Sequence, residues 1–237
     1  MTHKRIGPHL TSLHALLDQA QCLLLDFDGP VCRLFYGLPA HRVAARMREH
    51  LSRHGIDLDD LAGSLDPHRI LCAAMPRQRA AELEEMLADE EELAARSAQP
   101  TPDAAEFIQA AAGGGKLLAI TTNNAPSAVA AYLKEHGLDG YFGPHIFGRG
   151  DDPALMKPHP DCLLRAMAAL DMAPRDCLMI GDSPPDAAAA MTAGVGFLGY
   201  ARSPDRVARL RTLGPHPVVV GMRDLVAAAR SLEPPSG

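Results

Sequence analysis

The stretch CLLLDFDGPVC, residues 22–32, places two aspartates directly after a short apolar run. The run, Cys22 to Leu25, has the composition of a buried strand, and Asp26 and Asp28 follow it with one residue between them. Because residues i and i+2 of an extended chain point the same way, both carboxylates can face one point in space. Carboxylates held so close repel each other unless a cation or a proton neutralises them. The stretch therefore predicts a site of chemistry at the end of a strand.

Further apolar runs along the chain are typical of buried strands. They are continuous rather than alternating, which favours strands covered on both faces of a parallel sheet. Helical patterns with Pro-Asp starts or glycine ends lie between them. The expected strands are 116–120, 145–147 (the weakest), 177–180, 195–200 and 217–221, and the expected helices are 9–19, 102–112, 126–136, 160–170, 184–193, 203–213 and about 222–232. This alternation predicts an α/β fold with a Rossmann-like parallel sheet.

Residues 34–99 interrupt the alternation with helical patterns alone, at 40–54, 66–75 and 78–97. We therefore expect a small all-α insertion, residues 34–99, and an α/β core formed by residues 1–33 and 100–237. Residues 33–79 hold eight arginines and five acids, a net +3, whereas residues 80–106 hold one arginine and nine acids, a net −8. The acidic run ELEEMLADEEELAARS is interpreted as a solvated helix face. The arginine excess is a weaker candidate for steering an anionic ligand.

Polar residues follow several of the other expected strands. Thr122 and Asn123 come after the strand at 116–120, Lys157 follows the weak strand, and Asp182 and Asp186 follow the strand at 177–180. In open α/β sheets, ligands bind beyond the carboxyl ends of the strands, so these groups converge on one edge. Clustered carboxylates suit a hard divalent ion such as Mg²⁺. The hydroxyl, amide and ammonium donors suit a phosphate group.

These motifs, in this order, resemble the four motifs of the haloacid dehalogenase-like hydrolase superfamily. Asp26-Phe27-Asp28-Gly29 is similar to the first motif, Thr122-Asn123 to the second, Lys157 in KPHPD to the third and GDSPPD to the fourth. The insertion resembles the small helical cap of phosphoglycolate phosphatase-like and β-phosphoglucomutase-like members. The resemblance implies a phosphatase that acts on a small phosphorylated metabolite through an aspartyl-phosphate intermediate.

The resemblance also implies roles for the residues of the first three motifs. Asp26 would be the nucleophile, and Asp28 would protonate the leaving alcohol and then activate a water. Thr122 and Lys157 would hold phosphate oxygens, and Lys157 would also offset the charge of the nucleophile. Asn123 belongs to the same substrate-binding loop and would shape it.

The same resemblance implies a Mg²⁺ cofactor. Its ligands would be the carboxylate of Asp26, the main-chain carbonyl of Asp28 and the carboxylate of Asp182. Asp186 would act beside them, either directly or through a water molecule. An alternative, structural interpretation of GDSPPD is a capped helix start, and the two interpretations are compatible.

Asp28 and Pro30 bear on the choice among members of the superfamily. A halide leaves without a proton but an alkoxide needs one, so Asp28 favours a phosphatase over a dehalogenase, with phosphomutase and phosphonatase as minor alternatives. Pro30 departs from the Thr or Val usual in the family. It removes a backbone N–H and fixes φ, so we expect an altered loop and altered substrate gating. A catalytically idle ligand-binding or regulatory protein on the same fold is the remaining alternative.

Composition bounds the partners and the setting. The net charge of −6, from 23 basic and 29 acidic residues, gives no basic excess for nucleic acid. No window approaches 18 uninterrupted apolar residues, so no membrane segment is expected. An odd count of five cysteines and an N-terminal MTHKRIGPHL without a signal-peptide pattern favour the cytoplasm. His50 and His54 have no evident third ligand, so no zinc site is expected. Nothing in the sequence indicates an oligomeric state.

Overall fold

The computed structural model describes residues 8–56, 63–75, 79–214 and 216–232. Within that part of the chain the principal strands are β1 (Cys22–Leu25), β4 (Leu117–Thr121), β5 (Ile146–Phe147), β6 (Cys177–Gly181), β7 (Gly196–Ala201) and β8 (Val218–Val220). They form a six-stranded sheet in the order β5-β4-β1-β6-β7-β8, with every neighbouring pair parallel. The predicted α/β fold with a parallel sheet is confirmed, and the weak strand at 145–147 is present as β5.

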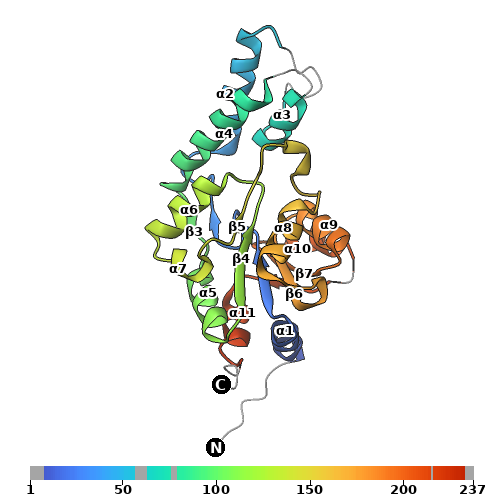
Figure 1. The fold of residues 1–237 in the computed structure, drawn as a ribbon. Coiled ribbons are helices and arrows are strands. Elements are labelled where there is room, and N and C mark those ends of the chain that lie inside the picture. The colour runs from blue at the N-terminus through green and yellow to red at the C-terminus, as the bar shows by residue number, and fades with distance from the viewer. Residues whose placement is uncertain (1–7, 57–62, 76–78, 215, 233–237) are drawn as a thin grey trace, which may run out of the picture.

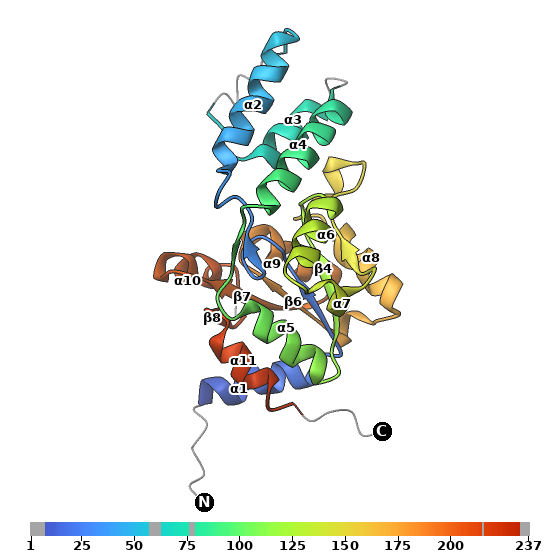
Figure 2. The same cartoon turned by 90° about the vertical axis from the view of Figure 1, so that its left-hand side faces the viewer.

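Helices cover both faces of this sheet (Figures 1 and 2). The core helices are α1 (Pro8–Gln19), α5 (Ala104–Gly113), α6 (Pro126–Glu135), α7 (Asp139–Phe142), α8 (Asp161–Leu170), α9 (Pro184–Ala193), α10 (Pro204–Arg211) and α11 (Arg223–Ala229). Alternate residues of β1 face opposite layers: Leu23 and Leu25 pack with α1, α5, α6 and α11, whereas Cys22 and Leu24 pack with α8 and α9. Both faces of the central strand are therefore apolar, which is why its sequence is continuous rather than alternating.

Three helices of the inserted segment stand together at one end of the molecule (Figure 1). They are α2 (Ala40–Arg53), α3 (Pro67–Ala74) and α4 (Ala80–Ala95), and they share an apolar cluster separate from the sheet. Met156, from the loop after β5, joins this cluster, and α4 packs against α6. We call residues 34–99 the helical insertion.

The chain leaves the sheet for the helical insertion and returns from it through a short antiparallel pair. This pair joins β2 (Cys32–Arg33) to β3 (Gln99–Pro100). Arg33 donates to the Gln99 side chain over 2.9 Å, and its guanidinium lies over the ring of Tyr36. The sequence pattern did not predict this pair, because two residues per strand are too few to leave a periodic signal.

The predicted helix limits agree with the observed ones to within about three residues. The short helix α7 and the two 3-10 turns Pro153–Leu155 and Pro174–Asp176 were not predicted. Gln78, the expected start of α4, lies outside the described residues.

Strand order reverses beside β1, since the chain continues to β4 on one side and β6 lies on the other. The loops after these three strands therefore meet at one point, where such folds bind ligands.

Candidate active site

The loop after β1 carries Asp26 and Asp28. The backbone N–H of Asp26 donates to the carbonyl of Ile180, so the strand ladder fixes Asp26 at the boundary with β6. The carboxylate of Asp28 accepts a hydrogen bond from the backbone N–H of Leu34 over 3.0 Å, at the start of the helical insertion. Asp26 is buried and Asp28 is half-buried. The two acids therefore face the same region but make different contacts.

Gly29 permits the close approach of this loop to the loop after β6. Its φ is +128°, in a region that side chains rarely adopt, and a Cβ added to it would lie 2.5 Å from Cγ of Asp182. Pro30 follows within a tight turn in which the N–H groups of Val31 and Cys32 both donate to the carbonyl of Phe27. The turn uses the two N–H groups that follow Pro30, so the missing donor costs no hydrogen bond of this turn.

Lys157 is the buried cation of the site. Its side chain is only 2% exposed, and its ammonium donates to Asp26 Oδ1 over 2.8 Å, to Asp186 Oδ1 over 2.5 Å and to the carbonyl of Thr121 over 2.9 Å. The side chain of Asn123 holds the backbone of Lys157, accepting from its N–H over 2.7 Å and donating to its carbonyl over 3.0 Å. Asn123 thus fixes the backbone of the loop that carries Lys157.

The loop after β6 presents Asp182 and Asp186. Asp186 Oδ2 accepts from the backbone N–H groups of Asp182 and Ser183 and from the Ser183 hydroxyl. Asp186 therefore takes part in a capping box with Ser183 at the N-terminus of α9. Asp182 Oδ2 accepts from Arg206 of α10 over 2.5 Å. The predicted helix start at GDSPPD is confirmed. Asp186 both caps this helix and belongs to the acidic cluster.

Electrostatics of this cluster favour a bound cation. Burial, and then repulsion from Asp186, raise the pKa of Asp26 to about 8 and that of Asp182 to about 7. Burial also raises the pKa of Asp28. Burial would lower the pKa of Lys157, but the carboxylates of Asp186 and Asp26 outweigh it and raise that pKa. The neighbouring ammonium therefore does not offset all of the repulsion among these acids, and a bound cation would reduce it further.

The donor set fits a hard divalent ion. Asp26, Asp182 and Asp186 each offer a carboxylate oxygen, and these oxygens lie within 4.8 Å of one another. Oxygen donors of this kind, at the edge of an open cavity that water can enter, are what Mg²⁺ takes in proteins. The side chain of Asp28 is not one of this group.

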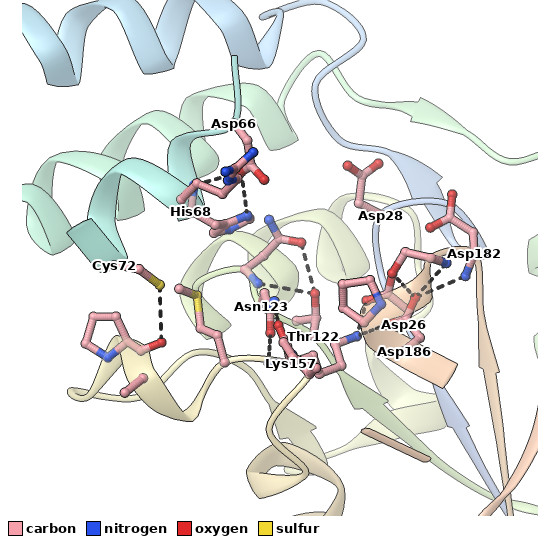
Figure 3. A pocket seen from close by; sticks show the side chains of 18 of the residues that line it. Asp26, Asp28, Asp66, His68, Cys72, Thr122, Asn123, Lys157, Asp182 and Asp186 are labelled. Atoms are coloured by element: carbon pink, nitrogen blue, oxygen red, sulfur yellow. Dashed lines mark hydrogen bonds and ion pairs between the residues drawn. The ribbon is translucent and has the colours of Figure 1, made fainter. Parts of the chain in front are cut away.

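These residues line a cavity of about 780 Å³ between the sheet edge and the helical insertion (Figure 3). From the sheet side, Thr122 donates its hydroxyl to Asn124 Oδ1 over 2.9 Å. The far wall comes from the helical insertion and the loop after β5, and includes Asp66, His68, Arg69, Cys72, Pro153, Ala154 and Met156. All the site residues expected from the sequence, namely Asp26, Asp28, Thr122, Asn123, Lys157, Asp182 and Asp186, line this cavity.

Sequence reasoning missed a second polar cluster beside the cavity. Glu91, within the acidic run interpreted as a solvated helix face, is fully buried and ion-paired with Arg149. The interpretation was wrong for Glu91, because the face of α4 that carries it packs against the core. Burial of one of the seven acids in this run leaves no signal in the sequence.

The helical insertion also brings a third side chain to His50 and His54. Glu82 of α4 offers a carboxylate oxygen within 4.8 Å of the imidazoles, although it lies far away in the sequence. Its carboxylate is hydrogen-bonded to His50 over 3.2 Å and to Arg79. The group is largely exposed, and protein donors already occupy the carboxylate.

No helix within the described residues is long and apolar enough to cross a membrane.

The parallel sheet, the strand-end acids and the buried lysine define a class of α/β enzymes with catalytic groups at the carboxyl edge of the sheet. More narrowly, the chain belongs to the haloacid dehalogenase-like hydrolases, because the pattern of that family matches residues 20–194.

Curated relatives are homologous over part of their length. A phosphoglycolate phosphatase of Yersinia pestis is 30% identical over 133 residues, which cover 56% of this chain and 56% of that protein. The phosphoglycolate phosphatase of Escherichia coli (strain K12) is 36% identical over 98 residues, which cover 41% of this chain and 38% of that protein. The chain thus spans about two fifths to somewhat more than half the length of these relatives.

Solved structures share the whole fold. A hydrolase of the same family from Deinococcus radiodurans R1, with bound phosphate and sodium, is 25% identical at a TM-score of 0.59, covering 92% of this chain and 99% of its own. CbbY from Rhodobacter sphaeroides, in complex with phosphate, has a TM-score of 0.67 and covers 89% of this chain and 99% of its own. At 19% identity, the second likeness shows the fold alone.

Proposed function

We propose that this chain is a Mg²⁺-dependent phosphatase that hydrolyses a small phosphate monoester through an aspartyl-phosphate on Asp26. The observation that carries the proposal is the buried contact between Lys157 and Asp26, with Asp182 and Asp186 gathered beside it on the cavity wall. The curated relatives named phosphoglycolate phosphatases support it. So does the bound phosphate of the Deinococcus structure.

In the first step, a carboxylate oxygen of Asp26 attacks the phosphorus, and the bond from phosphorus to the leaving oxygen breaks. Asp28 gives its proton to that oxygen, and its raised pKa suits a group that must carry a proton. In the second step, Asp28 takes a proton from a water that attacks the phosphorus. Inorganic phosphate leaves and Asp26 is regenerated.

Thr122 and Lys157 hold the phosphoryl oxygens in this proposal. The Lys157 ammonium offsets the charge of Asp26, which otherwise repels an incoming phosphate. The Thr122 hydroxyl, which donates to Asn124 Oδ1 in this structure, would donate to a phosphate oxygen instead. Asn123 acts through the backbone of Lys157 rather than on the substrate.

The carboxylates of Asp26 and Asp182 and the main-chain carbonyl of Asp28 would hold Mg²⁺, with Asp186 beside them. When bound, the ion supplies positive charge that stabilises the transferring phosphoryl group. Because Arg206 pairs with Asp182, binding of the ion would require that contact to yield.

We further propose that residues 34–99 form a cap over a core of residues 1–33 and 100–237, and that the cap selects the leaving group. Its face of the cavity carries His68, Arg69 and Cys72. Arg69 is exposed on the cavity wall and has no ion-pair partner among the described residues, so its guanidinium would meet a carboxylate on the substrate. Phosphoglycolate is therefore the first substrate to test.

The five free cysteines support a reducing, cytoplasmic setting.

The test is Mg²⁺-dependent phosphate release from an aryl phosphate, phosphoglycolate and a broad panel of phosphate esters, with Asp26→Asn as the control. We expect release that EDTA abolishes and that the variant lacks. A wild-type protein that binds Mg²⁺ but releases no phosphate from any ester would leave the idle ligand-binding alternative.

A further inference from the structure

Glu91 is a fully buried carboxylate that the proposed chemistry does not use. It lies on α4 of the helical insertion, and 0% of its side chain is exposed. A buried acid of this kind is costly unless several donors satisfy it. Its neighbours therefore indicate what the residue is for.

Five hydrogen bonds converge on this carboxylate. Its Oε1 accepts from His68 Nε2 over 3.1 Å, from Asn124 Nδ2 over 2.9 Å and from Arg149 Nη1 over 3.2 Å. Its Oε2 accepts from the backbone N–H of Ala125 over 2.8 Å and from Arg149 Nη2 over 3.1 Å. Burial would raise the pKa of Glu91, but His68 and Arg149 outweigh it and lower the pKa to about 2. The carboxylate is therefore charged.

Arg149 extends the network toward the same loop. Its buried guanidinium donates to the carbonyl of Asn123 over 2.7 Å and to Glu84, which lies two turns before Glu91 on the same face of α4, over 2.6 Å. Two side chains, Glu91 and Arg149, thus hold the backbone carbonyl of Asn123, the side chain of Asn124 and the N–H of Ala125. Loop 122–125 is fixed at each of these points.

That loop is the one that presents the phosphate-binding groups. Asn124 accepts from the Thr122 hydroxyl and returns a hydrogen bond from its own N–H over 3.2 Å. Asn123 holds the backbone of Lys157. A shift of the loop would therefore move both Thr122 and Lys157 relative to Asp26.

We propose that Glu91 is a positioning residue for phosphate binding: its charge holds loop 122–125 in place and, through His68, fixes α3 of the helical insertion against that loop. The inference rests on the proposed function, because it assigns the loop to phosphate. One residue thereby sets the geometry of the loop and of the opposite cavity wall. It touches neither the substrate nor the reacting atoms.

Both oxygens of Glu91 are needed, which makes glutamine an informative substitution. A glutamine has the same shape but offers one acceptor oxygen, so its NH₂ group must face donors on one side. Either Ala125 and Arg149, or His68, Asn124 and Arg149, would lose their acceptor. Glu85→Gln is the matched control, because Glu85 is exposed on the same helix and has no hydrogen bond among the described residues.

The experiment compares wild type, Glu91→Gln and Glu85→Gln for KM, kcat and inhibition by inorganic phosphate, alongside hydrogen exchange of the peptide that spans residues 121–127. In Glu91→Gln we expect KM and the phosphate inhibition constant to rise by roughly tenfold or more, with faster exchange in that peptide. Glu85→Gln should match wild type in all of these.

Arg149→Lys is the second variant, because it keeps a cation beside Glu84 and Glu91 but cannot reach both oxygens and the Asn123 carbonyl together. Arg149→Lys should also raise KM and the phosphate inhibition constant, and it serves as the test if Glu91→Gln does not fold. Folded variants with lowered thermal stability but wild-type phosphate inhibition and exchange would overturn the proposal, since Glu91 would then be merely structural. If wild type releases no phosphate, the proposed function fails, while the exchange comparison still decides whether Glu91 holds the loop.

Discussion

Replacing Lys157 by methionine removes the ammonium that bridges Asp26 and Asp186 while keeping a side chain of similar length. Asp26, with a pKa of about 8, is largely protonated at pH 7 in EDTA, so the ion pair with Asp186 sets the loss. At the 2.5 Å between Nζ and Asp186 Oδ1, unit charges attract by about 7 kcal/mol at an effective dielectric constant near 20, before the cost of burial is subtracted. Protonation limits the loss. A carboxyl with an ordinary pKa of about 3.9 takes up a proton at pH 7 for about 4 kcal/mol. We therefore expect Lys157→Met to lower the free energy of unfolding by about 3 to 4 kcal/mol.

The assay is urea unfolding at pH 7 in EDTA, followed by far-UV circular dichroism. Lys134→Met is the control, because Lys134 is exposed on α6 and its side chain has no hydrogen bond or ion pair among the described residues. The control should change the unfolding free energy by less than about 0.5 kcal/mol. A loss below about 1 kcal/mol in Lys157→Met would refute the view that this ammonium neutralises the buried acids.

Gly29→Ala should reduce phosphatase turnover by roughly a hundredfold, because its Cβ would lie 2.5 Å from Cγ of Asp182. The control is Gly137→Ala, which should leave turnover unchanged because Gly137 has a φ of +65° but open space around it. Equal turnover of the two variants would contradict the close approach of Gly29 to Asp182. Saturating Mg²⁺ should raise the unfolding free energy of wild type, by about 2.7 kcal/mol at a hundred times its Kd, and leave Asp182→Asn almost unaffected in the same titration. Glu91 has a folded pKa of about 2, below its ordinary value of 4.5, so its charge stabilises the fold above pH 4.5 by on the order of 3 kcal/mol, and this is lost as pH falls toward 2. The stability gap between wild type and Glu91→Gln should therefore be smaller at pH 3 than at pH 7, and a constant gap in urea unfolding would count against the charged state.

Sequence alone could predict the strand-end part of the site, because parallel topology brings the residues after β1, β4 and β6 together whatever the details of packing. Asp26 and Asp182 lie far apart in the chain, yet each follows a continuous apolar run whose carboxyl end points to the same edge. Lys157 was predicted from the order of the four motifs rather than from a strand, because the strand before it, β5, has only two residues.

The Glu91 cluster could not be predicted in this way, because burial of Glu91 depends on how α4 docks on α6. The acidic run offers several acids at helical spacing, and only the docked face separates Glu91 from the exposed Glu85. Arg149 lies in a loop without regular structure, so no periodicity marks it. The effect of Pro30 could not be predicted for a related reason, because only the turn around Phe27 shows that the N–H which proline lacks is not needed there.

The central claim is that Asp26 carries the phosphoryl group during turnover. The most direct measurement is rapid acid quenching of wild type with Mg²⁺ and a hydrolysable phosphate ester, followed by mass spectrometry of the peptide that contains residues 22–32. We predict the added mass of one phosphoryl group on Asp26 in wild type and its absence in Asp26→Asn. Turnover with no phosphorylated peptide, or with the phosphoryl group on another residue, would contradict the account.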